Sequence, residues 1–368
     1  MKFSANRDNL MNGLNRVVNA IASKPIYPIL SNVLIETGDQ CVSFTGYDLE
    51  TKIKTTIDAE VESEGRITLP AKKLIQIISG FSAGAVMLEK DGDDDENIVR
   101  ISSNKTYYRM RGLSAVDYPE SDEFVQDWGF SVSGVDLINS LSKVAYARSE
   151  DENRKSLNGI LLSIRSGILT VAATDGRRLA LVENSFNDAL DKEVEGDIII
   201  PYKVVGELVK SFGTKDVMEV KLNSNSALFL SKSTTIVTKL VDGVYPNYRS
   251  VIPDNFNQKA VIPRAQFSEA LKQVSFFTNE VSGGVSFNLN TNEMQIKAVS
   301  AEFGESCASV DIALEGEPIN ISFNPQYFME PLKYLECEQL VLKYNDGFSP
   351  VALTGDEGFI YILMPLRG

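Results

Sequence analysis

The chain has 368 residues, more than one ordinary domain, and its 43% hydrophobic and 23% charged residues are typical of globular proteins and exclude disordered or fibrous chains. It has no histidine, which excludes Ser-His-Asp and Cys-His nucleophile systems, His-ligated metals and histidine acid–base catalysis. Its formal net charge of −14 argues against general nucleic-acid binding, because lysine and arginine are needed to neutralise phosphates.

Cysteine usage and hydropathy indicate a protein of the cytoplasm. Cys41, Cys307 and Cys337 lie far apart without C-x-x-C spacing, so neither a disulfide framework nor a zinc site is encoded. The first ten residues turn polar at once, unlike a secretory signal, and no run approaches the roughly 18 apolar residues of a membrane-spanning helix. We therefore expect a cytoplasmic protein with no membrane association, metal or cofactor.

The first predicted helix occurs three times along the chain. Residues 3–18, 130–145 and 260–275 align without gaps, and apolar residues recur at i, i+4 and i+7, as on one face of an amphipathic helix. Asn6 and Ser133 stand where N-caps are expected, and the latter makes a capping box with Asp136. The nine aligned core positions are Leu10, Leu14, Val17, Leu137, Leu141, Val144, Phe267, Leu271 and Val274.

A second amphipathic helix, preceded by a β-rich run, also occurs three times, in residues 67–81, 198–212 and 321–335. Pro331 lies inside the third copy, and a proline in a helix interior costs about 3 kcal/mol, so we expect this helix to be kinked or shortened. The nine aligned apolar positions are Leu74, Ile78, Phe81, Val205, Val209, Phe212, Phe328, Leu332 and Leu335.

Alternating apolar and polar residues predict strands joined by tight turns, as in residues 32–59, 158–186 and 283–312. We predict an α+β fold of three repeated domains, each with two helices and antiparallel sheets. The polar stretches place the domains at residues 1–125, 126–255 and 256–368. Three unrelated domains would require the same two helices to match by accident in the same order.

Short motifs along the whole chain carry a resemblance to a known family. They are KPIYPILSNVLIE (24–36), RITLPAKKL (66–74), GLSAVDYPE (112–120), SLNGILL (156–162), AATDGRRLAL (172–181), IIIPYKVVGEL (198–208), KLVDGVYPNYRSVIP (239–253), FNPQYF (323–328) and YILMPLRG (361–368). In their order and spacing they resemble the bacterial DNA polymerase III β subunit, the replicative sliding clamp. The resemblance implies the DNA clamp fold, in which each chain forms half of a closed ring.

The same resemblance implies a function without catalysis. A ring-shaped homodimer, joined head to tail, would encircle double-stranded DNA without sequence preference and act as a processivity factor of replication. The implied partners are the DNA polymerase III α subunit, an ATP-dependent clamp loader, and other polymerases and repair proteins with clamp-binding peptides. The alternative is a protein-only interaction scaffold that does not encircle DNA.

An enzyme would have to work with carboxylates, lysines or tyrosines alone. The motifs GYDLE (46–50) and TDG (174–176) could suggest metal or phosphate binding, but the chain contains neither G-x-x-x-x-G-K-[ST] nor G-x-G-x-x-G. TDG also has a plain role as a turn between strands. We therefore expect a binding protein, not an enzyme.

The placement of basic residues decides whether an acidic chain can hold DNA. Acidic clusters such as residues 91–97 are predicted in loops, whereas many lysines fall on the predicted helices, so a ring lined by helices would be positive inside. A sliding protein should bind phosphates weakly and read no bases. For each candidate the alternative is an ordinary solvated side chain. The positions that the resemblance assigns to DNA are Lys24, Lys72, Arg154, Lys155 and Lys203.

The resemblance also implies an apolar groove in which partner proteins insert a short extended peptide. A flexible methionine and branched aliphatic side chains suit repacking around several ligands. Arg177 departs from family members that carry histidine there. The alternative is that the aliphatic residues are core. The implied groove residues are Leu157, Thr174, Gly176, Arg177, Arg178, Leu179, Pro246, Val251, Asn324, Tyr327, Ile362, Met364, Pro365 and Arg367.

Ring closure requires a surface of the first domain to meet the third domain of the other chain. Phe276 and Phe277 follow the first helix of the third repeat and are hard to bury together within one protomer, although one of them could be core. The residues that the resemblance assigns to the dimer interface are Lys73, Ile77, Lys105, Phe276, Phe277, Glu302 and Glu305.

Overall fold

The secondary structure groups into two compact units. A computed structural model describes residues 1–22, 25–90, 97–119, 124–185, 195–212, 217–278 and 284–366. Unit 1 consists of Met1–Val135 with Gly206–Leu240, and unit 2 of Asp136–Val205 with Val241–Gly368. The chain has the predicted α+β fold with antiparallel sheets. Its α-helices within the described residues are α1 (Arg7–Val17), α2 (Ala71–Ser79), α3 (Gly134–Val144), α4 (Lys155–Asn158), α5 (Tyr202–Phe212), α6 (Arg264–Ser275) and α7 (Pro325–Met329).

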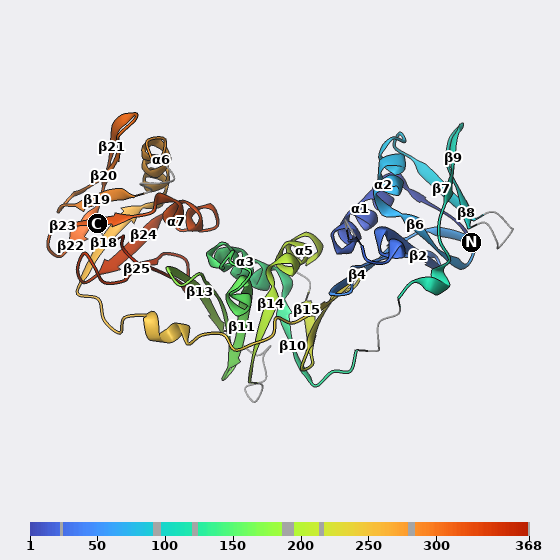
Figure 1. Ribbon diagram of the computed structural model, residues 1–368, viewed down its shortest axis with the longest axis horizontal. Helices are drawn as coiled ribbons and strands as arrows, with labels where there is room; N and C mark the ends of the chain where they lie inside the picture. The colour runs from blue at the N-terminus through green and yellow to red at the C-terminus, as the bar shows by residue number, and fades with distance from the viewer. Residues whose placement is uncertain are drawn as a thin grey trace. The chain divides into compact units, whose positions relative to one another are not determined.

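Unit 1 contains two sheets. The five-stranded sheet has the order β5 (Glu60–Ser63), β1 (Lys2–Asn6), β7 (Ala85–Lys90), β8 (Ile98–Ser103), β9 (Thr106–Arg111). The eight-stranded sheet has the order β10 (Trp128–Ser133), β15 (Val217–Leu222), β16 (Ser226–Leu230), β17 (Thr234–Lys239), β4 (Thr51–Asp58), β3 (Cys41–Tyr47), β2 (Asn32–Gly38), β6 (Gly65–Pro70). The helix α1 packs against α2 and against β3 and β4. Figure 1 shows both helices on the same side of the eight-stranded sheet.

Unit 2 also contains two sheets. The nine-stranded sheet has the order β14 (Gly196–Pro201), β11 (Gly159–Arg165), β12 (Ile168–Thr174), β13 (Arg178–Ser185), β26 (Phe359–Leu363), β25 (Val351–Thr354), β24 (Gln339–Tyr344), β18 (Gln258–Pro263), β22 (Ala313–Glu315). The four-stranded sheet has the order β21 (Gly304–Asp311), β20 (Glu293–Ser300), β19 (Val285–Leu289), β23 (Ile319–Phe323). The helix α6 packs on β20, β21 and α7.

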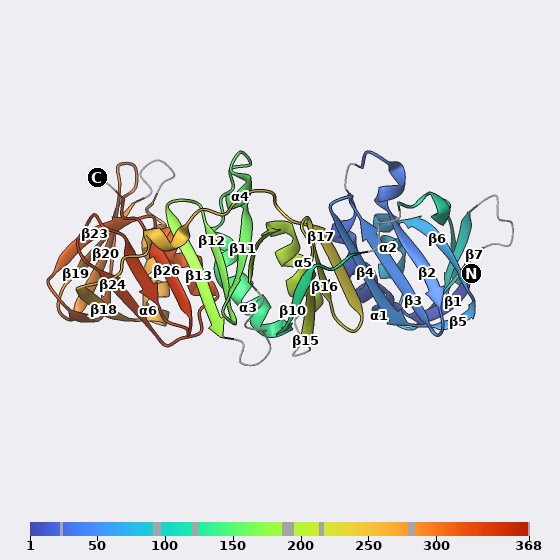
Figure 2. The same ribbon diagram turned by 90° about the horizontal axis from the view of Figure 1, so that it is seen from below.

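In each unit, one pair of strands from different repeats joins their sheets. In unit 1, β17 pairs with β4, and this joint buries two threonine pairs whose hydroxyl oxygens lie 3.2 and 3.0 Å apart. In unit 2, β13 pairs with β26, a strand from the far end of the sequence (Figure 2). Both large sheets therefore continue from one repeat into the next. The predicted boundaries at residues 125 and 255 stay a prediction.

The repeated helix pattern matches the observed burial. All nine positions of the first helix have relative exposures of 1% or less. The Asn6 side chain caps α1 by accepting the backbone N–H of Asp8 at 2.9 Å, as predicted. In the second helix, eight of the nine positions are buried, but Val209 is 40% exposed. Leu208 takes its place in the core, because three residues beyond Val205 it lies on the same helix face.

The third copy of the second helix is shortened at its proline. The helix α7 ends at Met329, and residues Pro331–Lys333 form a separate 3-10 turn, η6. A proline lacks the N–H that would bond the preceding turn, so the α-helix ends before it. Its apolar residues Phe328, Leu332 and Leu335 are nevertheless buried.

A largely buried ion pair ties α3 to the turn between β25 and β26 in unit 2. The Lys143 Nζ lies 2.5 Å from the Asp356 Oδ2, and this carboxylate also accepts the backbone N–H groups of Glu336 and Cys337 at 3.1 and 2.8 Å. Burial opposes ionisation of Asp356, but the bonds to Lys143 and to the backbone hold its pKa below the ordinary 3.8.

This depressed pKa predicts an acid-sensitive contribution to stability. A carboxyl whose pKa is lower in the folded state stabilises the fold at neutral pH, and the contribution disappears as the pH falls below about 4 and through the folded pKa. We expect Asp356→Asn to lower the free energy of unfolding by about 2 kcal/mol at pH 7 and by much less at pH 3. Urea unfolding at both pH values measures this, and an equal loss at both would contradict it.

Candidate functional site

A small groove lies on the nine-stranded sheet of unit 2. It encloses a cavity of about 80 Å³ that is lined by the β12–β13 turn, by the segment before β18 and by the end of β26. Its lining within the described residues consists entirely of predicted groove residues: Thr174, Gly176, Arg177, Arg178, Leu179, Val251, Ile362 and Met364.

Pairing of β13 with β26 brings these distant segments together. The register places Leu179 opposite Ile362 and Arg178 opposite Leu363. Beyond the ladder, the backbone N–H of Met364 donates to the carbonyl oxygen of Arg177 at 3.1 Å. The groove therefore depends on strand register, since a slip of one residue would turn Leu179 and Ile362 to the opposite face of the sheet.

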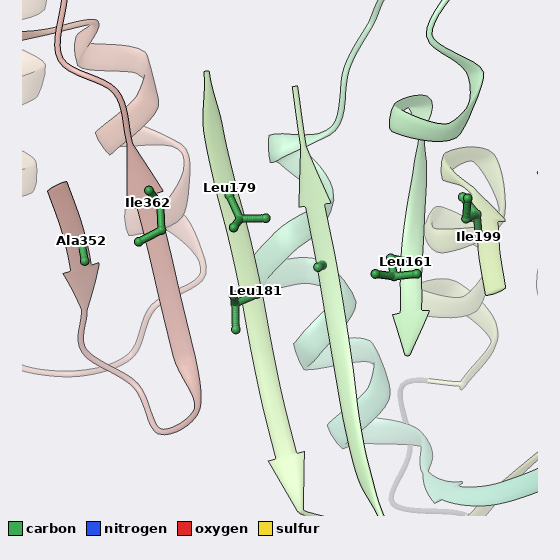
Figure 3. Close-up of a cluster of buried hydrophobic side chains, with 7 residues drawn as sticks. Leu161, Leu179, Leu181, Ile199, Ala352 and Ile362 are labelled. Carbon is green, nitrogen blue, oxygen red and sulfur yellow. The ribbon is translucent and has the colours of Figure 1, made fainter. Parts of the chain in front are cut away.

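The groove floor belongs to an apolar cluster that spans the sheet. Figure 3 shows that its side chains come from β11, β13, β14, β25 and β26: Leu161, Leu179, Leu181, Ile199, Ala352 and Ile362. The segment leading to β18 packs on this cluster through Val241, Tyr245, Tyr248, Ile252 and Phe256.

The rim of the groove is more exposed than its floor. Leu179 and Ile362 are each 2% exposed, whereas Met364 is 39% and Val251 is 50% exposed. Exposed apolar side chains beside an apolar floor form a surface that a partner can cover.

The β12–β13 turn is shaped by one aspartate. The Asp175 Oδ1 accepts the backbone N–H groups of Arg177 and Arg178 at 2.8 and 3.0 Å. Gly176 adopts φ 88°, a left-handed conformation that glycine reaches without strain from a Cβ. The Thr174 hydroxyl donates to the carbonyl oxygen of Arg178 at 2.6 Å and accepts the N–H of Gly176 at 3.1 Å. The polar groups of this turn therefore bond to one another.

A buried tyrosine anchors the strand that leads into the turn. The Tyr245 hydroxyl accepts the backbone N–H of Thr174 at 3.0 Å. Burial raises the pKa of this phenol above its ordinary value, so the hydroxyl is neutral at physiological pH. Sequence reasoning missed Tyr245, although it precedes the predicted groove residue Pro246.

Arg178 directs its guanidinium into the protein, where its side chain is only 8% exposed. Nε bonds the Asp175 Oδ2 at 3.0 Å, Nη2 donates to the carbonyl oxygen of Tyr146 at 2.8 Å, and Nη1 pairs with the Glu330 carboxylate. The guanidinium carbon lies 4.4 Å from the centroid of the Tyr327 ring. Burial alone would lower the pKa of Arg178, but Tyr361 and Glu330 raise it, so the group stays charged.

The other predicted groove residues do not line the cavity. Leu157 and Pro365 are buried, Pro246 is exposed, and the Asn324 side chain caps α7 by accepting the N–H of Gln326 at 3.0 Å. Tyr327 contacts the lining residue Arg178. Arg367 lies outside the described residues. Their role in ligand binding stays a prediction.

The predicted DNA-binding residues occupy different settings. Lys72 on α2, Lys155 on α4 and Lys203 on α5 are exposed. Arg154 is also exposed, but its Nη1 donates to the carbonyl oxygen of Asp175 at 2.8 Å, which places it against the groove turn. Lys24 lies outside the described residues.

The helices are positive although the chain is acidic. Together α1, α2, α3, α5, α6 and α7, with the single lysine of α4, carry ten basic and four acidic residues, a net charge of +6. The remaining chain therefore carries −20, since the total is −14. One of the helical lysines, Lys143, is engaged with Asp356.

The predicted dimer-interface residues are also mostly exposed. Lys105, Glu302 and Glu305 are exposed, and Phe276 is 80% exposed, whereas Phe277 is half-buried. Their part in a dimer stays a prediction.

The two predicted interface residues on α2 differ in their settings. Lys73 is exposed and bonds Gln76 at 3.1 Å. Ile77 is only 9% exposed, so most of its side chain already packs within unit 1.

Comparison with known families decides the affiliation of the chain. Three models of the DNA polymerase III beta subunit match consecutive segments: the N-terminal domain at residues 1–122, the central domain at residues 131–247 and the C-terminal domain at residues 249–367. The chain belongs to the DNA polymerase III beta subunit family. This confirms the predicted resemblance and the three-domain fold class.

Relatives match along their whole length. The beta sliding clamp of Synechococcus elongatus is 30% identical over 377 residues, covering 100% of this chain and 99% of the relative. That of Chlamydia pneumoniae is 29% identical over 367 residues, with the same coverages. The crystal structure of the Pseudomonas aeruginosa sliding clamp bound to griselimycin has a TM-score of 0.93 at 26% identity, and covers 100% of both chains. The Bacillus subtilis sliding clamp has a TM-score of 0.92 at 26% identity, covering 100% of this chain and 99% of that one.

Within this beta subunit chain, no helix of the described ranges is long and apolar enough to cross a membrane.

Four residues that shape the groove were missed by sequence reasoning: Asp175, Tyr245, Tyr146 and Glu330. Asp175 belongs to the TDG motif, which the sequence identified as a turn between strands but not as part of the groove. The others act through contacts that no local pattern encodes.

The geometry of the groove turn predicts a position-specific glycine effect. A Cβ on Gly176 would require a strained φ and would stand 3.2 Å from the Arg154 Nη2. We therefore expect Gly176→Ala to lower the free energy of unfolding by about 1 kcal/mol or more. The matched control is Gly206→Ala, in α5, where a Cβ meets no atom within 4 Å and helix propensity favours alanine. Chemical denaturation should show opposite signs, and equal effects would contradict this account.

Proposed function

We propose that this beta subunit is a sliding clamp that closes around duplex DNA as a homodimer and tethers partner proteins through the groove of unit 2. The observation that carries the proposal is the match of three consecutive segments to the three domains of the beta subunit. In this role the chain holds DNA by topology and has no catalytic activity of its own. Its work on chromosomal DNA places it in the cytoplasm.

The charge distribution supports DNA encirclement by an acidic protein. Helices with a net charge of +6 would line the ring, whereas the acidic excess, −20, belongs to the rest of the chain. Lys72 and Lys203 are exposed on such helices and can contact phosphates without reading bases. Weak, sequence-independent contacts allow sliding, whereas closure of the ring prevents dissociation.

The proposal predicts that retention depends on DNA topology. Protein loaded on nicked circular DNA with an ATP-dependent clamp loader should stay bound through gel filtration, and linearisation should release nearly all of it. The Lys72→Glu, Lys203→Glu double variant should load less well, because its contacts with phosphate are reversed in charge. Equal retention on circular and linear DNA would contradict encirclement, and no retention on either would favour a protein-only scaffold.

Two edge strands support a head-to-tail dimer. The strand β9 ends one sheet of unit 1, and β21 ends one sheet of unit 2, so among the described strands each has an edge without a neighbour that could pair with another chain. Residues 105–111 carry three basic and no acidic side chains, whereas residues 302–311 carry three acidic and no basic ones. Opposite charges on two edges favour pairing of β9 with β21 of a second copy.

Exposed apolar side chains accompany both edges. Tyr107 is 57% and Tyr108 is 43% exposed on β9, while Val299 is 61% and Phe303 is 66% exposed beside β21. Glu305 already pairs with Lys297 at 2.6 Å, but an exposed ion pair of this kind is weak and can exchange partners. Burial of these apolar groups would supply the driving force for association.

The dimer predicts a specific monomeric variant. Phe276→Lys with Phe277→Ala should halve the mass from twice the 40.5 kDa of one chain, because the lysine would place a charge where the proposed dimer buries an apolar ring. Sedimentation equilibrium measures this, with Phe348→Lys as a control at a 79% exposed phenylalanine of another turn. Alkylation of the exposed Cys307 on β21 should be faster in the monomeric variant. An unchanged dimer mass would refute this interface.

The groove supports tethering of partner proteins. Its apolar floor and exposed Met364 suit a short extended peptide with hydrophobic anchors. The proposed partners are the DNA polymerase III α subunit, the clamp loader, and other polymerases and repair proteins that carry such peptides. The loader must supply nucleotide hydrolysis, because the chain contains no phosphate-binding glycine motif.

A further inference from the structure

The β3–β4 turn of unit 1 repeats the backbone plan of the groove turn. The Asp48 Oδ1 accepts the backbone N–H groups of Glu50 and Thr51 at 3.1 and 2.7 Å. The N–H of Lys239, at the end of β17, donates to the carbonyl oxygen of Glu50 at 2.9 Å. One aspartate thus shapes the turn, and the neighbouring strand closes it with one backbone bond.

The groove turn of unit 2 has the same bonds at equivalent positions. Asp175 accepts the N–H groups of Arg177 and Arg178, and the N–H of Met364 closes the turn on the carbonyl oxygen of Arg177. Both turns therefore share the two aspartate bonds and the closing backbone bond from the neighbouring strand.

The two turns differ in the residue that begins the following strand. In unit 1 it is Thr51, which is buried and lies hydroxyl to hydroxyl with Thr238 at 3.2 Å. In unit 2 it is Arg178, whose guanidinium is almost fully buried. Burying a guanidinium costs desolvation free energy that an uncharged side chain avoids. Since the same turn folds around a threonine, folding of the turn does not require the arginine.

The guanidinium instead connects the groove turn to two segments that do not belong to it. It bonds Asp175 in the turn, the carbonyl oxygen of Tyr146 in the 3-10 turn η4 (Ala145–Ala147), and Glu330 at the C-terminal end of α7. The flat face of the group stacks on Tyr327 of α7. Glu330 is its sole acidic partner from outside the turn among the described residues.

We propose that Glu330 is a positioning residue for the groove. It fixes Arg178, and Arg178 holds the turn from Thr174 to Leu179 in the shape that receives a ligand. This inference rests on the proposed peptide-binding function of the groove. Glu330 itself does not line the cavity, so its effect on a ligand must pass through Arg178. In the equivalent turn of unit 1, Thr51 bonds Thr238 and makes no ion pair like that of Arg178 with Glu330, which indicates a role specific to the groove.

The probe is griselimycin, which is bound to the sliding clamp of Pseudomonas aeruginosa. We expect the wild-type dimer to bind it in calorimetry and Met364→Glu to abolish binding, because a carboxylate would replace an apolar rim. Failure of either result would overturn the groove itself, and with it this inference.

Once binding to the groove is established, two conservative variants test the contact between Arg178 and Glu330. Glu330→Gln and Arg178→Lys should each weaken binding about tenfold, and the double variant should be no weaker than Arg178→Lys, because both act in one contact. The control Glu336→Gln removes an exposed carboxylate six residues after Glu330 in the sequence, and this variant should bind like wild type.

Measurements of melting temperature and dimer mass distinguish a role of Glu330 in positioning the groove from a role in folding. The positioning role predicts that Glu330→Gln, at a carboxylate that is 30% exposed, keeps both near wild-type values while losing affinity. Unchanged affinity in Glu330→Gln, or additive losses in the double variant, would overturn the proposal. A lowered melting temperature with unchanged affinity of the folded protein would show a purely structural ion pair and would overturn it as well.

Discussion

Antiparallel pairing between strands of different repeats is the constraint on which the rest of this structure depends. The β17–β4 and β13–β26 pairs make continuous sheets, and each also creates the turn region beside it. Because side chains alternate between the faces of a strand, register decides which residues meet. Leu179 and Ile362 form a groove floor only because their strands pair in one register.

Comparison of the two repeated turns distinguishes residues that the fold requires from residues that belong to the groove. The aspartate turn occurs in both units with the same backbone bonds, so Asp48 and Asp175 serve the fold. A threonine follows one turn and a buried arginine the other. The uncharged copy supports our proposal that the buried arginine serves the groove, since desolvation disfavours an unneeded buried charge.

In this chain the net charge is a poor guide to whether the protein can bind nucleic acid. An overall charge of −14 suggested repulsion from DNA, whereas the helices carry an excess of basic residues. Electrostatic attraction depends on the local arrangement of charges over about a Debye length of 8–10 Å, so a basic helix surface can act independently of an acidic loop.

Helical periodicity, proline geometry and motif order are local properties of the chain, so the amino-acid sequence was enough to predict the repeated helices, most of their buried positions, the shortening at Pro331 and the family. It also identified all eight described residues that line the groove, through motifs of the family. The tertiary structure alone decided that Val209 is exposed, that Arg154 lies against the groove turn, and that Arg178 points inward to Glu330. These contacts join residues far apart in sequence, and only the packing of strands and helices fixes their distances.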